Sequence, residues 1–221
     1  MTDTLYLDNN ATTRVAPEVR EAILPFLGER YGNPSSPHHF GGSIEADLTL
    51  ARNRLASLVG CSPKEIFFTS GGTESDNLAI RGILASHPDR RHIVTTQVEH
   101  SAVLVQCREL EKQGFRVTYL PVDSDGGLKI ADLEEAIDEE TALVSIMWAN
   151  NETGVLQPMK AIGDICDKHG VLLMSDATQA VGKIPVSPKD AGVHLMAFSA
   201  HKMYGPKGVG ALYVCRRQPR V

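Results

Sequence analysis

The chain has 221 residues, of which 42% are hydrophobic and 22% are charged, and its formal net charge is −5. This length allows one large domain or two small ones, and the composition excludes disorder for the bulk of the chain. The acidic balance argues against a nucleic-acid partner. The longest apolar run, residues 143–148, is far too short to cross a bilayer, so we expect no membrane partner.

The four cysteines occur singly, at positions 61, 107, 166 and 215, and none forms a C-x-x-C pair. This spacing argues against a zinc or thioredoxin-like site, and we predict no metal site. The N-terminal segment has neither a basic flank nor a long apolar core, so we expect no signal peptide. A cytoplasmic protein with reduced, mostly buried cysteines follows, and nothing around any of them marks a nucleophile.

Residues 1–16 are polar and irregular, and we expect them to form an arm that lies over the active site of a single domain, residues 17–221. In that domain, segments with helical apolar spacing alternate with short apolar runs typical of strands. In chain order the expected elements are a helix at 43–59, a strand at 65–70, a helix at 73–85, a strand at 92–97, a helix at 101–113, a strand at 117–122, a helix at 130–137, a strand at 142–150, a helix at 158–169, and strands at 171–177, 195–200 and 210–215.

Several of these apolar runs lack polar alternation, which is typical of strands buried on both faces of a parallel sheet. The alternation with helices therefore predicts an α/β domain with a mostly parallel seven-stranded sheet and helices on both faces. Gly114 and Gly170 follow expected helices and are predicted to end them.

Ligands of such a sheet bind beyond the carboxyl ends of its strands. The first strand is followed by Ser70-Gly71-Gly72-Thr73, where two glycines and a helix N-terminus favour a phosphate site. A plain strand-to-helix turn remains the alternative. The segment is neither a Walker A loop nor a G-x-G-x-x-G motif, so a dinucleotide site is not favoured.

Four further strand ends carry candidate residues. His100 could stack on a flat ring or transfer a proton, and the amide of Asn151 could hold polar ligand atoms. Asp176 ends an apolar strand, where a carboxylate needs a cation. Lys202 could form a Schiff base. Each has a simpler alternative, such as a helix start, a turn or a solvated lysine. Together with the phosphate site they supply what pyridoxal 5'-phosphate requires.

At these residues the chain is identified as a member of the class V aminotransferase-like, fold-type I pyridoxal-phosphate enzymes. It closely resembles the cysteine desulfurases of the NifS/IscS type, and the resemblance runs through nearly the whole chain. The matching stretches are YLDNNATT (6–13), YGNPSS (31–36), FTSGGTESDN (68–77), VEHSAV (98–103), MWANNETG (147–154), SDATQAVGK (175–183) and AFSAHKMYGPKGVGALYV (197–214).

The resemblance implies a role for each matching residue. Lys202 would form a Schiff base with the cofactor, Asp176 would pair with its pyridinium nitrogen, and His100 would stack on its ring and transfer protons. Gln179 would contact the phenolic oxygen of the cofactor, and Asn151 would contact both the cofactor and the substrate carboxylate. The phosphate would be held by Gly72, Thr73, Ser199 and His201. The substrate entrance would be lined by Asn10, Ala11, Thr12 and Asn33.

The implied reaction removes sulfur from L-cysteine. The substrate amine would replace Lys202 on the cofactor, and the Cα proton would leave. A cysteine thiolate on a mobile loop would then attack the substrate sulfur, which gives L-alanine and an enzyme persulfide. The resemblance also implies a homodimer and an iron–sulfur scaffold protein as sulfur acceptor.

Members of this family are longer than this chain. Their C-terminal small domain carries the nucleophilic cysteine, a substrate-binding arginine and a threonine that completes the partner subunit's phosphate site. None of the four cysteines here matches the context of the nucleophile. We therefore expect a chain that lacks the small domain and is inactive alone. The alternatives are a non-catalytic fragment that binds the cofactor or dimerises, and another class V enzyme such as an aminotransferase or a selenocysteine lyase-like member.

Overall fold

Seven strands form one sheet in the computed structural model, which describes residues 5–216. The strands are β1 (Ile66–Thr69), β2 (His92–Thr96), β3 (Arg116–Leu120), β4 (Thr141–Ser145), β5 (Leu172–Asp176), β6 (Leu195–Ser199) and β7 (Gly210–Val214). Their order is β1-β7-β6-β5-β4-β2-β3, and β7 is antiparallel to both neighbours while the other pairings are parallel. The predicted mostly parallel seven-stranded sheet is confirmed.

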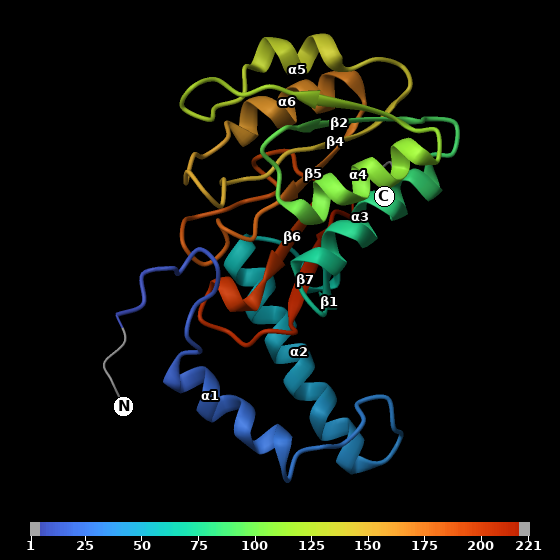
Figure 1. Cartoon of the computed structure of the whole chain (residues 1–221). Helices are drawn as coiled ribbons and strands as arrows, with labels where there is room; N and C mark the ends of the chain where they lie inside the picture. The colour runs from blue at the N-terminus through green and yellow to red at the C-terminus, as the bar shows by residue number, and fades with distance from the viewer. Residues whose placement is uncertain (1–4, 217–221) are drawn as a thin grey trace.

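Helices cover both faces of this sheet, as predicted (Figure 1). The helices α3 (Gly72–Ser86) and α4 (Ser101–Lys112) bury apolar side chains such as Ile80 and Val103 against one face. The other face is covered by α5 (Ile130–Ala136), α6 (Met159–His169) and the end of α2 (His39–Val59). Gly170 caps α6 in a left-handed conformation with φ of 64°, in which a side chain would be strained. The predicted end of this helix at Gly170 is therefore confirmed.

Two features of the fold differ from the sequence prediction. The helix α1 (Pro17–Ile23) and the short 3-10 helix η1 (Leu24–Leu27) were not predicted, since neither contains a buried residue that would create an apolar stripe. The strand expected at 142–150 ends at Ser145. The apolar run continues because the following loop is also buried, and the N–H of Trp148 donates to the backbone oxygen of Asp176 (2.9 Å).

Residues 5–16 contain no helix or strand and lie along the segment that follows β6. The N–H of Thr13 donates to the backbone oxygen of His201 (2.8 Å), and the N–H of Ala16 donates to that of Tyr204 (2.9 Å). Residues 1–4 of the predicted arm and residues 217–221 of the predicted domain lie outside the described residues. The segment therefore reaches the carboxyl edge of the sheet, where the parallel strands end.

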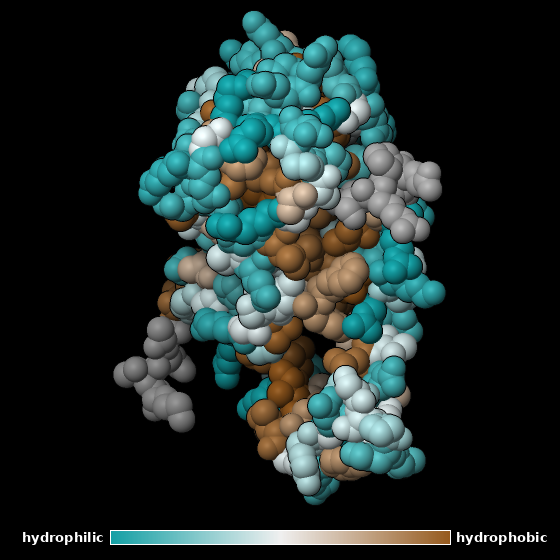
Figure 2. Space-filling view, turned by 90° about the vertical axis from the view of Figure 1, so that its right-hand side faces the viewer, coloured by the Kyte–Doolittle hydropathy of each residue, from teal (hydrophilic) through white to brown (hydrophobic). Residues whose placement is uncertain are grey.

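The part of the molecule formed by α1, η1 and the first turns of α2 projects from the sheet (Figure 1). Large apolar side chains here are exposed, including Leu24, Leu27, Tyr31 and Phe40. A band of hydrophobic surface is also visible in the space-filling view (Figure 2). Apolar surface of this kind commonly contacts another chain or segment. None of the described helices has the length and apolar character needed to cross a membrane.

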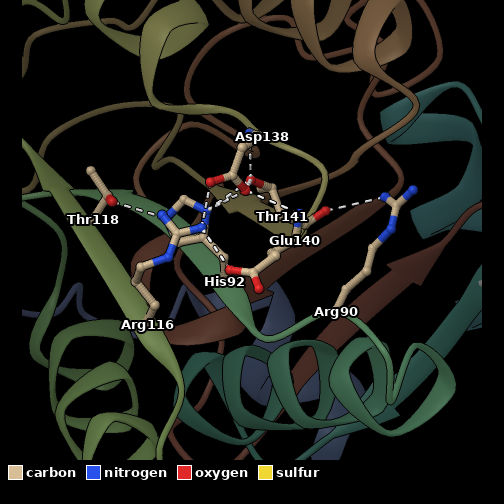
Figure 3. Close-up of polar contacts among 7 residues, drawn as sticks. All are labelled: Arg90, His92, Arg116, Thr118, Asp138, Glu140 and Thr141. Carbon is tan, nitrogen blue, oxygen red and sulfur yellow. Dashed lines mark hydrogen bonds and ion pairs between the residues drawn. The ribbon is translucent and has the colours of Figure 1, made fainter.

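A polar cluster around the buried His92 joins the strands at the opposite, amino-terminal edge of the sheet (Figure 3). His92 is completely buried, and its Nδ1 and Nε2 atoms lie 2.8 Å from Oγ1 of Thr141 and 2.9 Å from Oγ1 of Thr118. Arg116 pairs with Asp138, which lies 3.4 Å from the same imidazole. Burial, followed by the positive charge of Arg116, lowers the pKa of His92 and outweighs the attraction of Asp138. The imidazole is therefore held neutral.

The free energy of unfolding is expected to fall as the pH drops below about 6.5, the ordinary histidine pKa. Below this pH the unfolded chain binds a proton at His92, whereas the folded protein does not, because its His92 has a lowered pKa. The free energy of unfolding therefore decreases until the pH falls below the pKa of His92 in the folded protein. Urea denaturation at pH 7.5 and 5.5 measures this loss. The His92→Gln variant, which cannot titrate, should be less stable at pH 7.5 by about 2–3 kcal/mol but lose less between the two pH values. Equal losses in both proteins would contradict the prediction.

Candidate active site

A cavity of about 210 Å³ lies at the carboxyl edge of the sheet. It is enclosed by the N-terminal segment, the first turns of α3 and the residues that follow β2, β4, β5 and β6. The lining residues are Ala11, Gly72, Thr73, Asp76, His100, Met147, Ala149, Asn151, Asp176, Thr178, Gln179, Ser199, His201 and Lys202. Every cofactor-binding residue that the sequence indicated is in this set. Their individual roles remain predictions.

The N-terminus of α3 forms an open cradle in this cavity. A Cβ atom on Gly72 would lie 3.1 Å from Oγ1 of Thr178 and 3.8 Å from Cβ of Ser199, so glycine keeps this space free for a ligand. Backbone N–H groups in the first turn of a helix have no partner within the helix. Together with the hydroxyl groups of Thr73 and Ser199, they suit an anion such as a phosphate.

Lys202 ends the short 3-10 helix η3 (Ala200–Lys202), which directly follows β6. Its Nζ atom donates to the backbone oxygens of Asn10 and Ala11, the latter at 2.9 Å. Burial lowers the pKa of Lys202, although the negative charges of Asp176, Asp8 and Glu152 oppose this effect. A lowered pKa increases the fraction of neutral, nucleophilic amine, which is the form that attacks a carbonyl carbon.

Asp176 is the last residue of β5 and is only 7% exposed. The N–H of Thr178 donates to its Oδ1 atom (2.9 Å). The buried carboxyl groups of Asp76 and Glu99 interact electrostatically with it. Asp176 also lines the cavity, where its carboxylate would stabilise a cationic ring nitrogen.

The four residues predicted at the substrate entrance are not all at the cavity. Ala11 lines it, the backbone oxygen of Asn10 accepts from Nε2 of Gln179 (2.9 Å), and Oγ1 of Thr12 lies 3.1 Å from Nδ1 of His201. Asn33 does not line the cavity in this chain. It is exposed in the loop before α2, and its side chain accepts from the N–H of Ser35 (2.9 Å), because α2 begins in the part that projects from the sheet (Figure 1).

Four lining residues were not predicted, namely Asp76, Met147, Ala149 and Thr178. Asp76 follows Gly72 by four residues, and helical spacing therefore places both on one face of α3. This spacing was the available signal. Within residues 5–216, Oδ1 of Asp76 and Oγ1 of Thr178 are buried without a hydrogen-bond partner. Buried polar atoms are normally paired, so these two suit a ligand with polar atoms.

The residues of the cavity fit pyridoxal 5'-phosphate. The cradle at Gly72 suits the phosphate, Asp176 suits a pyridinium nitrogen, and Lys202 provides an amine for the aldehyde. Within residues 5–216, no group of three or more His, Cys, Asp and Glu side chains could hold a metal ion. A mostly parallel sheet with this site at its carboxyl edge is the large domain of a fold-type I pyridoxal-phosphate enzyme.

The sequence model of the class-V aminotransferases matches residues 5–219, and the chain belongs to this pyridoxal-phosphate-dependent family. It is 52% identical over 212 residues to a cysteine desulfurase of Nostoc sp., covering 96% of this chain and 53% of that protein. The solved structure of a NifS-like protein is 44% identical, with a TM-score of 0.94, and the match covers 98% of this chain and 60% of that one. A structure of SspA in complex with cysteine is 38% identical, with a TM-score of 0.93, and the match covers 96% of this chain and 61% of that one.

The chain spans about half the length of the curated relatives that it matches. None of its cysteines lines the cavity. Cys107, Cys166 and Cys215 are buried, and burial raises the pKa of the partly buried Cys61 to about 11. A thiol with this pKa is almost entirely protonated at neutral pH and is a poor nucleophile.

Proposed function

We propose that this chain is the cofactor-binding part of a cysteine desulfurase, an enzyme that removes sulfur from L-cysteine with the help of pyridoxal 5'-phosphate. The observation that carries the proposal is the convergence of Lys202, Asp176 and the N-terminus of α3 on one cavity. The similarity to proteins named cysteine desulfurase supports this choice of reaction among those of the family.

In this proposal each side chain has a separate task. The first turn of α3, with Thr73, Ser199 and His201, holds the phosphate, and Asp176 holds the protonated ring nitrogen. When bound, the cofactor provides an electron sink that makes the Cα proton of an amino acid acidic. The Nδ1 atom of His100 accepts from the N–H of Ala102 (3.2 Å), which leaves the Nε2 atom as the site that holds or moves a proton. Lys202 would provide the amine that holds the aldehyde of the cofactor.

L-Cysteine is the proposed substrate, and the structure of SspA with cysteine supports it by similarity. The amide of Asn151, which is partly buried at the cavity, would hold the substrate carboxylate. The segment with Asn10, Ala11 and Thr12 would close the entrance beside Lys202. Sulfur transfer requires a thiolate, and the four thiols of this chain lie outside the cavity.

We expect the cofactor-loaded chain to bind L-cysteine without releasing sulfide. The amine of the substrate can reach the site, but no thiol is positioned to take the sulfur atom. The visible absorption of the bound cofactor should therefore change on addition of L-cysteine, and a colorimetric sulfide assay should stay at background. D-Cysteine serves as the matched control. A spectral response to other amino acids but not to L-cysteine would contradict the proposed substrate.

Formation of L-alanine, with sulfide released only after a thiol reductant is added, would show that one of the four cysteines acts as the nucleophile, because elimination without a protein thiol gives pyruvate instead. Cys61 is the first to test by replacement with serine, since it is the least buried of them. Loss of the release in Cys61→Ser would then identify it.

Three further parts of the proposal concern the cellular context. A homodimer is supported by the exposed apolar side chains at Leu24, Leu27 and Tyr31, and sedimentation should give twice the mass of the chain.

A cytoplasmic location is supported by free thiols at all four cysteines. An iron–sulfur scaffold protein as the sulfur acceptor is supported by the resemblance of the sequence to the NifS/IscS type.

A further inference from the structure

The backbone around Lys202 closes its own turn only in part. The N–H groups of Met203 (3.0 Å) and Gly205 (2.9 Å) both donate to the backbone oxygen of Ala200. The N–H of Tyr204 instead donates to Oγ1 of Thr13 (2.8 Å), a residue of the N-terminal segment that lies far earlier in the chain. The segment that carries the amine therefore depends on a side chain from another part of the molecule.

The hydroxyl group of Thr13 bridges the residues on the two sides of Lys202 and Met203. Its Oγ1 atom accepts from the N–H of Tyr204 and donates to the backbone oxygen of His201 (3.0 Å). One hydroxyl group can do both, because it has one donor and two acceptor lone pairs. The bridge joins the C=O of the first residue of a four-residue segment to the N–H of the fourth, two groups that bond directly in many β-turns. Lys202 is the second residue of this segment.

Tyr204 has a left-handed backbone conformation, with φ of 65°, which is unfavourable for a residue with a bulky side chain. Such a conformation persists only where the surrounding contacts hold it. The N-terminal segment supplies these contacts, because Thr13 accepts from the N–H of Tyr204 and the N–H of Ala16 donates to its backbone oxygen (2.9 Å). The N–H of Thr13 adds a bond to the backbone oxygen of His201 (2.8 Å). The shape of the backbone after Lys202 is therefore fixed from outside.

Thr13 is 7% exposed and does not line the cavity, so it can act on a ligand there only through the residues that it holds. Its neighbours Asn10 and Ala11 contact the other end of Lys202, where their backbone oxygens accept from Nζ. The amine gives up its hydrogen atoms when it condenses with an aldehyde, and these contacts are then lost. The bonds of Thr13 involve only backbone atoms of the segment around Lys202, so they can remain.

We propose that Thr13 is a positioning residue of this site, whose hydroxyl group fixes the backbone on both sides of Lys202 and thereby keeps the amine directed into the cavity. Correct orientation of a reacting group contributes large factors to its rate of reaction. This inference rests on the proposed function, because the group that reacts with the amine is the aldehyde of pyridoxal 5'-phosphate. Loss of the hydroxyl group should therefore slow covalent attachment of the cofactor and leave its noncovalent binding nearly unchanged.

Two substitutions test the role of the hydroxyl group. Thr13→Val replaces it with a methyl group of similar size, whereas Thr13→Ser keeps it. Borohydride quenching at successive times after addition of pyridoxal 5'-phosphate measures how fast the label appears on Lys202. We expect attachment to be about tenfold slower in Thr13→Val, the usual effect of losing one hydrogen bond, and within about twofold of the wild type in Thr13→Ser. Thr49→Val, at an exposed position of α2, is the matched control and should label at the wild-type rate.

Pyridoxine 5'-phosphate separates positioning of the amine from general support of the site. It has an alcohol in place of the aldehyde, so it can occupy the cavity but cannot react with Lys202. We expect Thr13→Val to bind it within about twofold of the wild-type dissociation constant, because the N–H of Thr13 still holds His201. A loss of affinity as large as the loss of labelling rate would show that Thr13 only maintains the shape of the cavity. That result, or labelling of Thr13→Val at the wild-type rate, would overturn the proposal.

A third measurement needs no cofactor. Hydrogen exchange at the amide of Tyr204 should be about tenfold faster in Thr13→Val than in the wild type, because this N–H loses its partner, and nearly unchanged in Thr13→Ser. Equal exchange rates in the wild type and Thr13→Val would overturn the proposal. Thr13→Ala, which removes the hydroxyl group without a bulky replacement, takes the place of Thr13→Val if the valine variant does not fold. Failure of the wild type to bind either phosphate compound would refute the proposed function, while the exchange rates would still decide whether Thr13 fixes this segment.

Discussion

The Lys202→Ala variant is expected to lose all covalent attachment of pyridoxal 5'-phosphate. Lys202 supplies the amine that lines the cavity, and its pKa is lowered by burial, which favours the neutral nucleophile. The wild-type chain should turn yellow with the cofactor, and borohydride reduction followed by peptide mass mapping should place the label on the peptide with Lys202. The variant should remain colourless and give no labelled peptide.

Lys183 offers a matched control for this experiment. Burial, followed by the charge of Lys202, also lowers the pKa of Lys183, so a low pKa alone would make both lysines reactive. The Nζ atom of Lys183 instead donates to Oε1 of Gln179, and the residue does not line the cavity. Lys183→Ala should therefore keep the label at Lys202. A label on Lys183 in the wild type would contradict the assignment of the amine.

The sequence was sufficient for those parts of the site that lie directly at strand ends. Asp176 closes a strand of five buried residues, where a carboxylate is costly without a partner, and Lys202 follows the next strand. Because parallel strands bring their carboxyl ends to one edge, these residues converge without any knowledge of side-chain contacts. The same logic placed Gly72 and His100 correctly at the cavity.

The remaining parts depend on contacts between elements that a sequence pattern does not contain. Asp76 lies in a helix, where polar residues are usually solvated, and it is buried because α3 packs against β5 and β6. Asn33 belongs to a recognisable motif, yet its position depends on the direction in which α2 leaves the sheet. The helix α1 has no buried face, so its apolar periodicity is too weak to reveal it.

The Asp176→Ala variant is expected to weaken the binding of pyridoxal 5'-phosphate by about 30-fold or more, since removal of one partner of a buried charge pair costs about 2–5 kcal/mol. The ring nitrogen would lose its counter-charge, while Asp76 and Glu99, both favoured as neutral acids by burial, are poor substitutes. Absorbance or fluorescence titration of the purified chain gives the dissociation constant. The midpoint of the chromophore's pH titration should also move down, because a protonated nitrogen without an anion releases its proton more readily.

Asp190→Ala is the control for this variant, since it removes an exposed carboxylate at the opposite end of the β5–β6 connection. Its dissociation constant should stay within about twofold of the wild type, because exposed charges contribute little. Lys202 should still be labelled by borohydride in Asp176→Ala at saturating cofactor, since the amine and the cradle at Gly72 remain. A reduction in affinity below about threefold, with an unchanged spectral midpoint, would mean that Asp176 does not face the ring nitrogen.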